Sequence, residues 1–518
     1  MIEKQFNKSI FKLILAIFVI ELLSLISFKL AILSAIFFIF ISIAVLLFTL
    51  YKLEYGLYIA LIELMIGSYG YLFYLQLPGF KAPIRLAIFF IVFCVWLIKY
   101  FRARDFFNLL KKSRIIQTLI LFLVFLGIGF IKGFLHHNGL ANVFFDFNGY
   151  LYFGLFFVFL EVFKNEKQII DFLKILVASL IYVSLKIFIT LYFFSHGFLN
   201  ISDLLYHWIR DTRVGEITYA GANFFRIFFQ SQIWGLIGIF IILSLLIWKI
   251  LLSQKPLCHP EHVEGSVTSA RPKFLSLCGT TKWLFILLII LQTSILISFS
   301  RSFWLGEIAG FLVFFAYLIF KERLRLKLKK LAQIFGIVIS SVTISILLLI
   351  LITNFPIPKP SNEFAALMLK NRLFAFWGEA GVSSRWNELP VLLNQIKKAP
   401  LLGTGFGTTI TFQSEDPRIK NETNPEGWYT TYAFEWGYLD TVTEIGLLGL
   451  LVYLVFIGQI FYLGFKNLNT QYSIFITGLL IGLIALLITH TFSPYLNHPL
   501  GIGYLMLCIA IFQIKKDG

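Results

Sequence analysis

Apolar residues follow one another in long runs along almost the whole chain, and polar residues gather in the segments between these runs. A run of about 18 or more apolar residues is long enough to cross a bilayer core of about 30 Å as a helix. The pattern therefore predicts an all-α polytopic membrane protein with about 14 transmembrane helices. The predicted spans are residues 10–28, 30–50, 55–77, 85–101, 115–134, 143–163, 168–195, 227–252, 283–299, 302–320, 333–354, 440–463, 472–491 and 499–514.

One polar segment is much longer than the others and divides the chain. Residues 355–433 are predicted to form a large extracytoplasmic loop that contains short helices. The N-terminal transmembrane helices then lie within residues 1–354, and the C-terminal transmembrane helices lie within residues 434–518.

The composition supports a membrane protein rather than a soluble one. Hydrophobic residues make up 58% of the chain and charged residues only 14%, whereas a soluble protein carries about 25% charged residues. The mean hydropathy is +0.85. No part of this composition requires a bound cofactor.

The basic residues indicate how the chain is oriented in the membrane. Lysine and arginine total 44 against 27 acidic residues, a net charge of +17. They are concentrated in residues 99–114, residues 321–330 and the C-terminal Lys515-Lys516. With a cytoplasmic N-terminus and alternating spans, all three clusters face the cytoplasm, as the positive-inside rule requires. Both termini are therefore predicted to be cytoplasmic, and the charge does not call for nucleic acid as a partner.

Three segments then face outward and are expected to meet on one side of the membrane. They are residues 196–226, the short connection at residues 300–302 and the large loop 355–433. On the cytoplasmic side, residues 253–282 contain two cysteines and two histidines, but their spacing matches no common zinc site. This segment is predicted to be an insertion.

Charged residues of the outward segments are the first candidates for a site. Arg301 lies on the side where the positive-inside rule disfavours arginine, and Glu307 lies a turn and a half into the following span. An acid inside a span is costly unless it is paired or functional. Arg301 could also be an interfacial residue whose stem extends to water. Glu307 is predicted to be a structural partner rather than a catalyst.

The outer loop contains a predicted helix over residues 383–400. Its apolar residues recur at steps of three and four, and Pro390 should lie in its first turn or kink it. Ser383 and Ser384 are candidate caps, which would place Arg385 at a helix N-terminus, where a phosphate is favoured. The following PLLGTGFG, residues 400–407, predicts a tight turn whose glycines could also let backbone amides approach an anion.

Taken in order, these segments resemble the O-antigen ligase and O-antigen polymerase superfamily. The matching motifs are SRSFWLG at residues 300–306, Arg385-Trp386 followed by PLLGTG at residues 400–405, and ExWGYLDxxxEIGLLGL in the region 435–450. In that superfamily the last motif usually begins with His-Asn. In this chain Glu435 occupies the histidine position and Trp436 the asparagine position.

The resemblance implies a bacterial inner-membrane glycosyltransferase that acts in cell-surface polysaccharide assembly. Such enzymes transfer a glycan from a polyprenyl diphosphate carrier to a hydroxyl of an acceptor glycan or glycolipid, on the extracytoplasmic face. The family arginines that engage the diphosphate correspond to Arg301 and Arg385. Guanidinium groups suit this task because they bind phosphate oxygens bidentately.

The remaining candidate residues follow from this implied reaction. Glu435 is the candidate base for the acceptor hydroxyl, with Asp440 and Glu444 as the next choices. Arg226 could add a third cationic contact, and Arg210 and Arg213 are weaker choices. Trp436 and Tyr438 could bind the sugar. No cluster of metal ligands is visible in the outward segments, and no metal is predicted.

Other functions are compatible with parts of the pattern. A polymerase of lipid-linked repeat units has the same motifs as a ligase. A transporter or flippase of lipid-linked glycans would also be polytopic, but transporters usually show internal repeats and charges near the midplane of the membrane, and neither is visible in this chain. The replaced histidine would also fit a non-catalytic assembly subunit.

Overall fold

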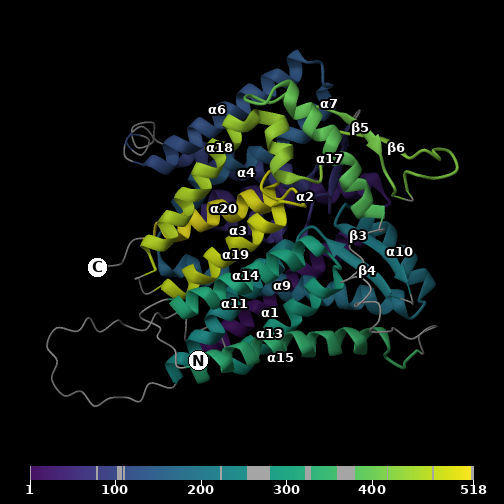
Figure 1. Cartoon of the computed structure of the whole chain (residues 1–518). Coiled ribbons are helices and arrows are strands. Elements are labelled where there is room, and N and C mark those ends of the chain that lie inside the picture. Colours follow the sequence, from purple (N-terminus) through teal and green to yellow (C-terminus); the bar gives the residue numbers. More distant parts are fainter. Residues whose placement is uncertain are drawn as a thin grey trace.

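The computed structural model describes residues 2–77, 80–101, 108, 111, 113–221, 224–253, 280–320, 328–358, 380–416, 418–468 and 472–514. The described chain is mostly helical, so the predicted all-α class is confirmed (Figure 1). The helices are α1 (Ile2–Ser27), α2 (Ala31–Tyr51), α3 (Leu53–Ile66), α4 (Ile84–Lys99), α6 (Arg114–Leu135), α7 (Leu140–Phe147), the 3-10 helix η1 (Asn148–Leu155), α8 (Phe156–Val162), α9 (Glu166–Ser195), α10 (Leu199–Asp211), α11 (Gln232–Ser253), α13 (Thr281–Ile297), α14 (Arg301–Phe320), α15 (Leu328–Thr353), α17 (Ala380–Lys398), α18 (Gly437–Lys466), α19 (Ser473–His490) and α20 (Pro499–Phe512).

Ten helical segments among the described residues are long and apolar enough to cross a membrane. The shorter apolar helices α13 and α20 pack among them. A polytopic membrane protein is thereby confirmed, and the more exact count of about 14 spans stays a prediction.

The helices differ in how much of their surface other helices cover. In the most apolar stretches of α11 and α19, 83% and 78% of the residues are buried inside the protein, so these two helices form the centre of the bundle. In α1 and α2 only 22% and 17% is buried. A helix that is apolar on all sides but mostly uncovered is suited to face lipid, and α1 and α2 therefore belong to the periphery.

Two predicted spans have a different local structure from a continuous helix. The span predicted at residues 55–77 ends as a helix at Ile66, because Ser68 and Gly70 adopt positive φ angles of 51° and 87°. The antiparallel hairpin of β1 (Tyr74–Leu77) and β2 (Phe80–Pro83) follows. The span predicted at residues 143–163 consists of α7, η1 and α8 in succession. Within η1, a Cβ on Gly149 would lie 2.4 Å from the carbonyl oxygen of Asn497, so this close approach requires glycine.

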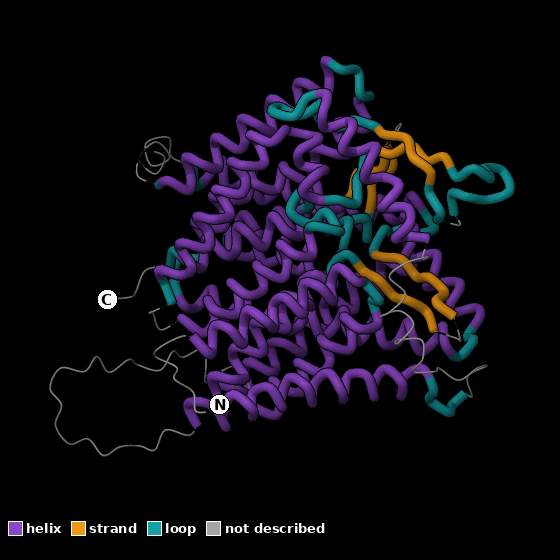
Figure 2. The backbone as a smooth tube through the Cα atoms, in the orientation of Figure 1, coloured by secondary structure: helices purple, strands orange, loops and turns teal. Residues whose placement is uncertain are grey.

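The polar elements gather at one end of the helical bundle. Figures 1 and 2 show the chain ends on one side and the strands with α10 and α17 on the other. Two further antiparallel hairpins lie there: β3 (Gly215–Gly221) with β4 (Phe224–Phe229), and β5 (Ile410–Gln413) with β6 (Trp428–Thr431). The described part of the large outer loop thus contains a helix and a hairpin. Most of residues 253–282, the predicted insertion, lie outside the described residues.

Candidate functional site

A cavity of about 940 Å³ lies at the polar end of the bundle. The hairpin β3–β4, the connection between α13 and α14, the outer loop and the segment 492–498 all contribute to its wall. Each of the three segments expected to face outward therefore supplies residues to one space. The contribution of residues 492–498 was not anticipated from the sequence.

The charged groups of the wall are mainly arginines. Five arginines line the cavity together with three acids, which leaves an excess of two positive charges: Arg210, Arg226, Arg301, Arg385 and Arg418 against Glu216, Asp416 and Glu435. Five of these residues were candidates from the sequence, and the fold brings them to the same space: Arg226, Arg301, Arg385, Glu435 and the weaker choice Arg210. Arg213 does not line it and instead stacks on Tyr71, 4.8 Å from the ring centroid.

Arg301 is the first residue of α14 and follows a sharp turn. Phe299 in that turn has a positive φ of 48°. The neighbouring serines hold the connection: the Ser300 and Ser302 hydroxyls lie 3.0 Å apart, and Ser302 lies 3.0 Å from the Ser493 hydroxyl. The serines on both sides of Arg301 therefore fix the backbone from which the arginine reaches the cavity.

Phe303 and Gly306 of the SRSFWLG motif are buried inside the bundle. A Cβ on Gly306 would lie 2.6 Å from the carbonyl oxygen of Ala485, so glycine lets α14 approach α19 closely. Glu307 is buried and accepts a hydrogen bond from the Gln292 side chain of α13. Glu307 does not line the cavity and joins two helices instead.

The local structure around Arg385 differs from the expectation. Helix α17 begins at Ala380, so Ser383 and Ser384 lie inside the helix rather than at its cap. Pro390 lies in the helix interior, not in the first turn, which was one of the two positions expected for it. The Ser384 hydroxyl accepts a hydrogen bond of 2.8 Å from the backbone N–H of Glu415. The prediction that Arg385 lies at a helix N-terminus is therefore wrong, because the helix extends further toward the N-terminus than the serine pattern suggested.

Arg385 forms an ion pair with Glu435 at the wall of the cavity. The Arg385 Nε donates to the Glu435 Oε2, and both side chains remain partly exposed. Behind them, Glu388 lies one turn further along α17 with only 2% of its surface exposed. Burial, and then the charge of neighbouring Glu435, raise the pKa of Glu388 to about 7.

The two aromatic candidates next to Glu435 do not line the cavity. The Trp436 Nε1 donates to the Arg385 carbonyl oxygen at 3.1 Å, and its ring packs against Trp386 and Phe492. The Tyr438 hydroxyl donates to the Leu487 carbonyl oxygen at 3.1 Å. Both residues therefore anchor the start of α18, and the sugar contact predicted for them has no support from their position.

Arg418 was not recognised from the sequence, because it stands among other charges in the polar loop. Its Nε lies 3.0 Å from both carboxylate oxygens of Asp416, and its Nη1 lies 3.5 Å from Glu216 of β3. The Arg418 guanidinium lowers the pKa of Asp416. This network joins the outer loop to the β3–β4 hairpin across the cavity wall.

The PLLGTGFG segment forms a turn that packs into a break in α18. At Gly446 the helix is interrupted by a φ of 75°. The N–H groups of Leu447 and Leu448, which the break frees from the helix, donate to the carbonyl oxygens of Pro400 and Leu401 at 2.8 and 3.2 Å. The turn motif and the EIGLLG motif therefore depend on one another for backbone hydrogen bonds, and their role here is structural.

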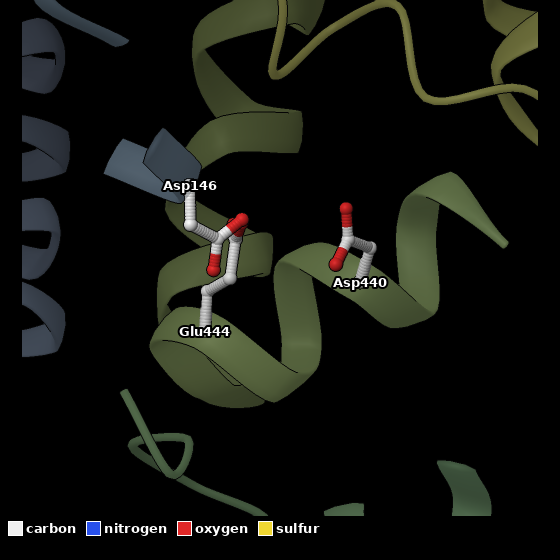
Figure 3. Close-up of side chains that lie close together, drawn as sticks. All are labelled: Asp146, Asp440 and Glu444. Carbon is white, nitrogen blue, oxygen red and sulfur yellow. The ribbon is translucent and has the colours of Figure 1, made fainter. Parts of the chain in front are cut away.

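The alternative bases, Asp440 and Glu444, lie away from the cavity wall. They are buried on adjoining turns of α18 and lie next to Asp146 of α7 (Figure 3). Sequence reasoning missed this cluster, because Asp146 is almost 300 residues away in the chain and falls within a predicted span. Of the candidate bases, Glu435 is the one at the cavity.

These features define a polytopic helical membrane protein with an arginine-rich cavity at one end of its helices. Residues 284–454 match the family model described as O-antigen ligase, and this match supports membership of the O-antigen ligase superfamily. The match includes Arg301, Arg385 and Glu435, whereas Arg226 precedes it. Neither curated proteins nor solved structures gave a match. The family indicates a membrane enzyme of the glycan ligase or polymerase type.

Proposed function

We propose that this protein transfers a glycan from a polyprenyl diphosphate carrier to an acceptor hydroxyl on the extracytoplasmic face of the bacterial inner membrane. The observation that carries the proposal is the cavity wall itself. Arg226, Arg301 and Arg385 come from three separate segments and line one space with an excess of two positive charges. Two of the three arginines belong to the O-antigen ligase region.

The charge and size of the cavity suit a diphosphate with attached sugars. Negative charge grows on the leaving diphosphate as the glycosidic bond breaks, and groups already positioned around that charge stabilise the transition state. Guanidinium forks provide two parallel hydrogen bonds to phosphate oxygens. A volume of about 940 Å³ is at the upper end of the range for small-molecule sites, which leaves room for an acceptor beside the donor.

Glu435 is the proposed base of the transfer. In the protein without substrate it is paired with Arg385. When the diphosphate engages Arg385, the Glu435 carboxylate becomes available for the acceptor hydroxyl. The hydroxyl oxygen bonds to the anomeric carbon, its proton passes to Glu435, and the diphosphate leaves with the electrons of the broken carbon–oxygen bond.

Aromatic residues on the cavity wall are better placed to contact sugars than Trp436 and Tyr438 are. Tyr69, Tyr206 and Tyr219 line the cavity. The Tyr206 hydroxyl accepts a hydrogen bond of 2.8 Å from Arg210. Aromatic rings combine an apolar face with a polar edge and therefore suit the alternating surfaces of a sugar. The polyprenyl chain would remain in the bilayer beside the apolar helices.

The proposal is tested with purified protein in proteoliposomes that contain a lipid-linked glycan donor and an acceptor glycolipid. Transfer to the acceptor supports a ligase, and lengthening of the carrier-linked glycan supports a polymerase. Movement of the donor across the membrane without transfer to the acceptor would show that the protein is a flippase rather than a glycosyltransferase. Arg301→Lys should lower the rate of transfer about 100-fold or more, and Arg213→Lys, which changes an arginine outside the cavity, should keep the wild-type rate. Normal transfer by Arg301→Lys would remove Arg301 from the proposed site.

A further inference from the structure

Three carboxylates from two distant parts of the chain meet beneath the outer end of the bundle. One ligand oxygen from each of Asp146, Asp440 and Glu444 lies within 4.8 Å of the other two. Figure 3 shows Asp146 approaching Glu444 from α7, with Asp440 on the adjoining turn of α18. Asp440 and Glu444 are 3% and 2% exposed, whereas Asp146 is half-buried.

Each carboxylate is oriented by one neutral hydrogen-bond donor. Glu444 Oε2 accepts from the Tyr150 hydroxyl, Asp440 Oδ2 accepts from the Asn497 side chain, and Asp146 Oδ2 accepts from the Gly407 backbone, each at 2.7 Å. Such donors fix the direction of a carboxylate without neutralising its charge. Among the described residues, none of the ion pairs involves these three acids.

The second oxygens of the two buried acids point to a missing ligand. Asp440 Oδ1 and Glu444 Oε1 are fully buried and have no hydrogen-bond partner. A buried acceptor without a partner costs about 1–3 kcal/mol, and more when it is charged. Two such oxygens in one acidic cluster are acceptors that a bound cation would satisfy.

We propose that Asp146, Asp440 and Glu444 bind a divalent cation of the oxygen-preferring class, Mg²⁺ or Ca²⁺. Carboxylates are the usual protein ligands of these ions. The site does not line the arginine cavity and takes no part in the proposed transfer, so it stands or falls independently of that function.

The proposed ion has a structural consequence. It would join α7 to the first turns of α18, next to the turn of residues 400–407 and to Asn497 before α20. Glu435 and Trp436 immediately precede α18. The ion would therefore fix the start of α18, which closely follows the proposed catalytic base Glu435, relative to α7.

Binding is measured on the full-length protein in nanodiscs after removal of metals with a chelator. Titration with CaCl₂ and MgCl₂ by calorimetry should reveal one saturable site for at least one of them, and the bound ion should raise the unfolding temperature. Asp440→Asn and Glu444→Gln should each weaken binding at least about tenfold. Glu422→Gln, which changes an exposed acid of the outer loop, should bind as the wild type does.

A further variant keeps the test decisive if the carboxylate variants do not fold. Asn497→Ala leaves all three ligands in place but removes the donor that orients Asp440, and it should weaken binding about 10- to 100-fold. The absence of saturable Ca²⁺ and Mg²⁺ binding to the wild type would overturn the proposal. Binding that is unchanged in both Asp440→Asn and Glu444→Gln would also overturn it. A third result would also refute the metal site. If Asp440→Asn and Glu444→Gln without metal were as stable as the wild type with metal, the carboxyl groups would share protons rather than bind an ion.

Discussion

Glu388 offers a quantitative test of the electrostatics behind the Arg385–Glu435 pair. Burial and the charge of Glu435 raise the pKa of Glu388 from an ordinary value of 4.5 to about 7. The folded protein therefore holds a proton on Glu388 at pH values where the unfolded chain has released it. Because the folded state binds more protons, stability is full below the unfolded pKa and is lost as the pH rises through the folded pKa.

The size of the effect follows from this change in pKa. A rise from 4.5 to about 7 corresponds to about 3 kcal/mol in the free energy of unfolding. Most of this, about 2–3 kcal/mol, should be lost between pH 5 and pH 8. Asp416, whose pKa is lowered, makes the free energy of unfolding rise with pH instead, but it titrates below this pH range.

Glu388→Gln should remove this pH dependence. Glutamine keeps an acceptor for the backbone N–H of Glu435, which bonds to the Glu388 carboxylate, but it does not titrate. The variant should match the wild type near pH 5 and be about 2–3 kcal/mol more stable at pH 8. Denaturant unfolding in nanodiscs, followed by tryptophan fluorescence, measures the free energy of unfolding of the two proteins at each pH. Glu422→Gln, an exposed acid, should keep the wild-type slope. Parallel pH curves for the wild type and Glu388→Gln would refute the reasoning.

Three further changes test the site and its support. Arg301→Lys should lower the rate of transfer about 100-fold or more, since a single donor to a developing charge contributes about 10²–10³, and Arg213→Lys should keep the wild-type rate in the same proteoliposome assay. Glu435→Gln should lower the transfer rate by about 10²–10⁴ without changing the free energy of unfolding by more than the few tenths of a kcal/mol expected for an exposed ion pair; an unaltered rate would exclude Glu435 as the base. Gly446→Ala should destabilise the protein, because φ is 75° and a Cβ would lie 2.2 Å from the Leu401 carbonyl oxygen. The control is Gly458→Ala in the same helix, where a Cβ meets nothing within 4 Å, and this variant should raise or maintain the unfolding temperature. Equal changes in unfolding temperature for the two variants would contradict the proposed packing of the turn.

Much of the architecture could be predicted because long apolar runs have few structural alternatives in a membrane. Helix α9, for example, occupies residues 166–195, where a span over 168–195 was predicted. The exceptions have local causes. The predicted span at residues 55–77 stops at Ile66, because positive φ angles at Ser68 and Gly70 redirect the chain into a hairpin that apolarity alone could not reveal.

Part of the candidate site could also be predicted. Arg301 was identified as a disfavoured charge on the side predicted to face outward. Arg301, Arg385 and Glu435 were also identified as positions of family motifs, and all three line the cavity. The start of α17 was misjudged, because serines inside a helix resemble caps when only the sequence is known. Trp436 and Tyr438 were predicted to face the substrate, but their direction depends on packing against Phe492 and on a hydrogen bond to Leu487.

The class of this protein follows from its sequence, because the length and apolarity of a segment decide whether it can cross a bilayer without unsatisfied backbone groups. The sequence also predicts which arginines face outward, since charge bias indicates the orientation of the spans. The tertiary structure alone decided which side chains meet. Arg418 reaches Glu216, and Asp146 reaches Asp440 and Glu444, only because helices and hairpins distant in the chain pack together. No local pattern records such contacts, because they depend on the packing of the whole bundle.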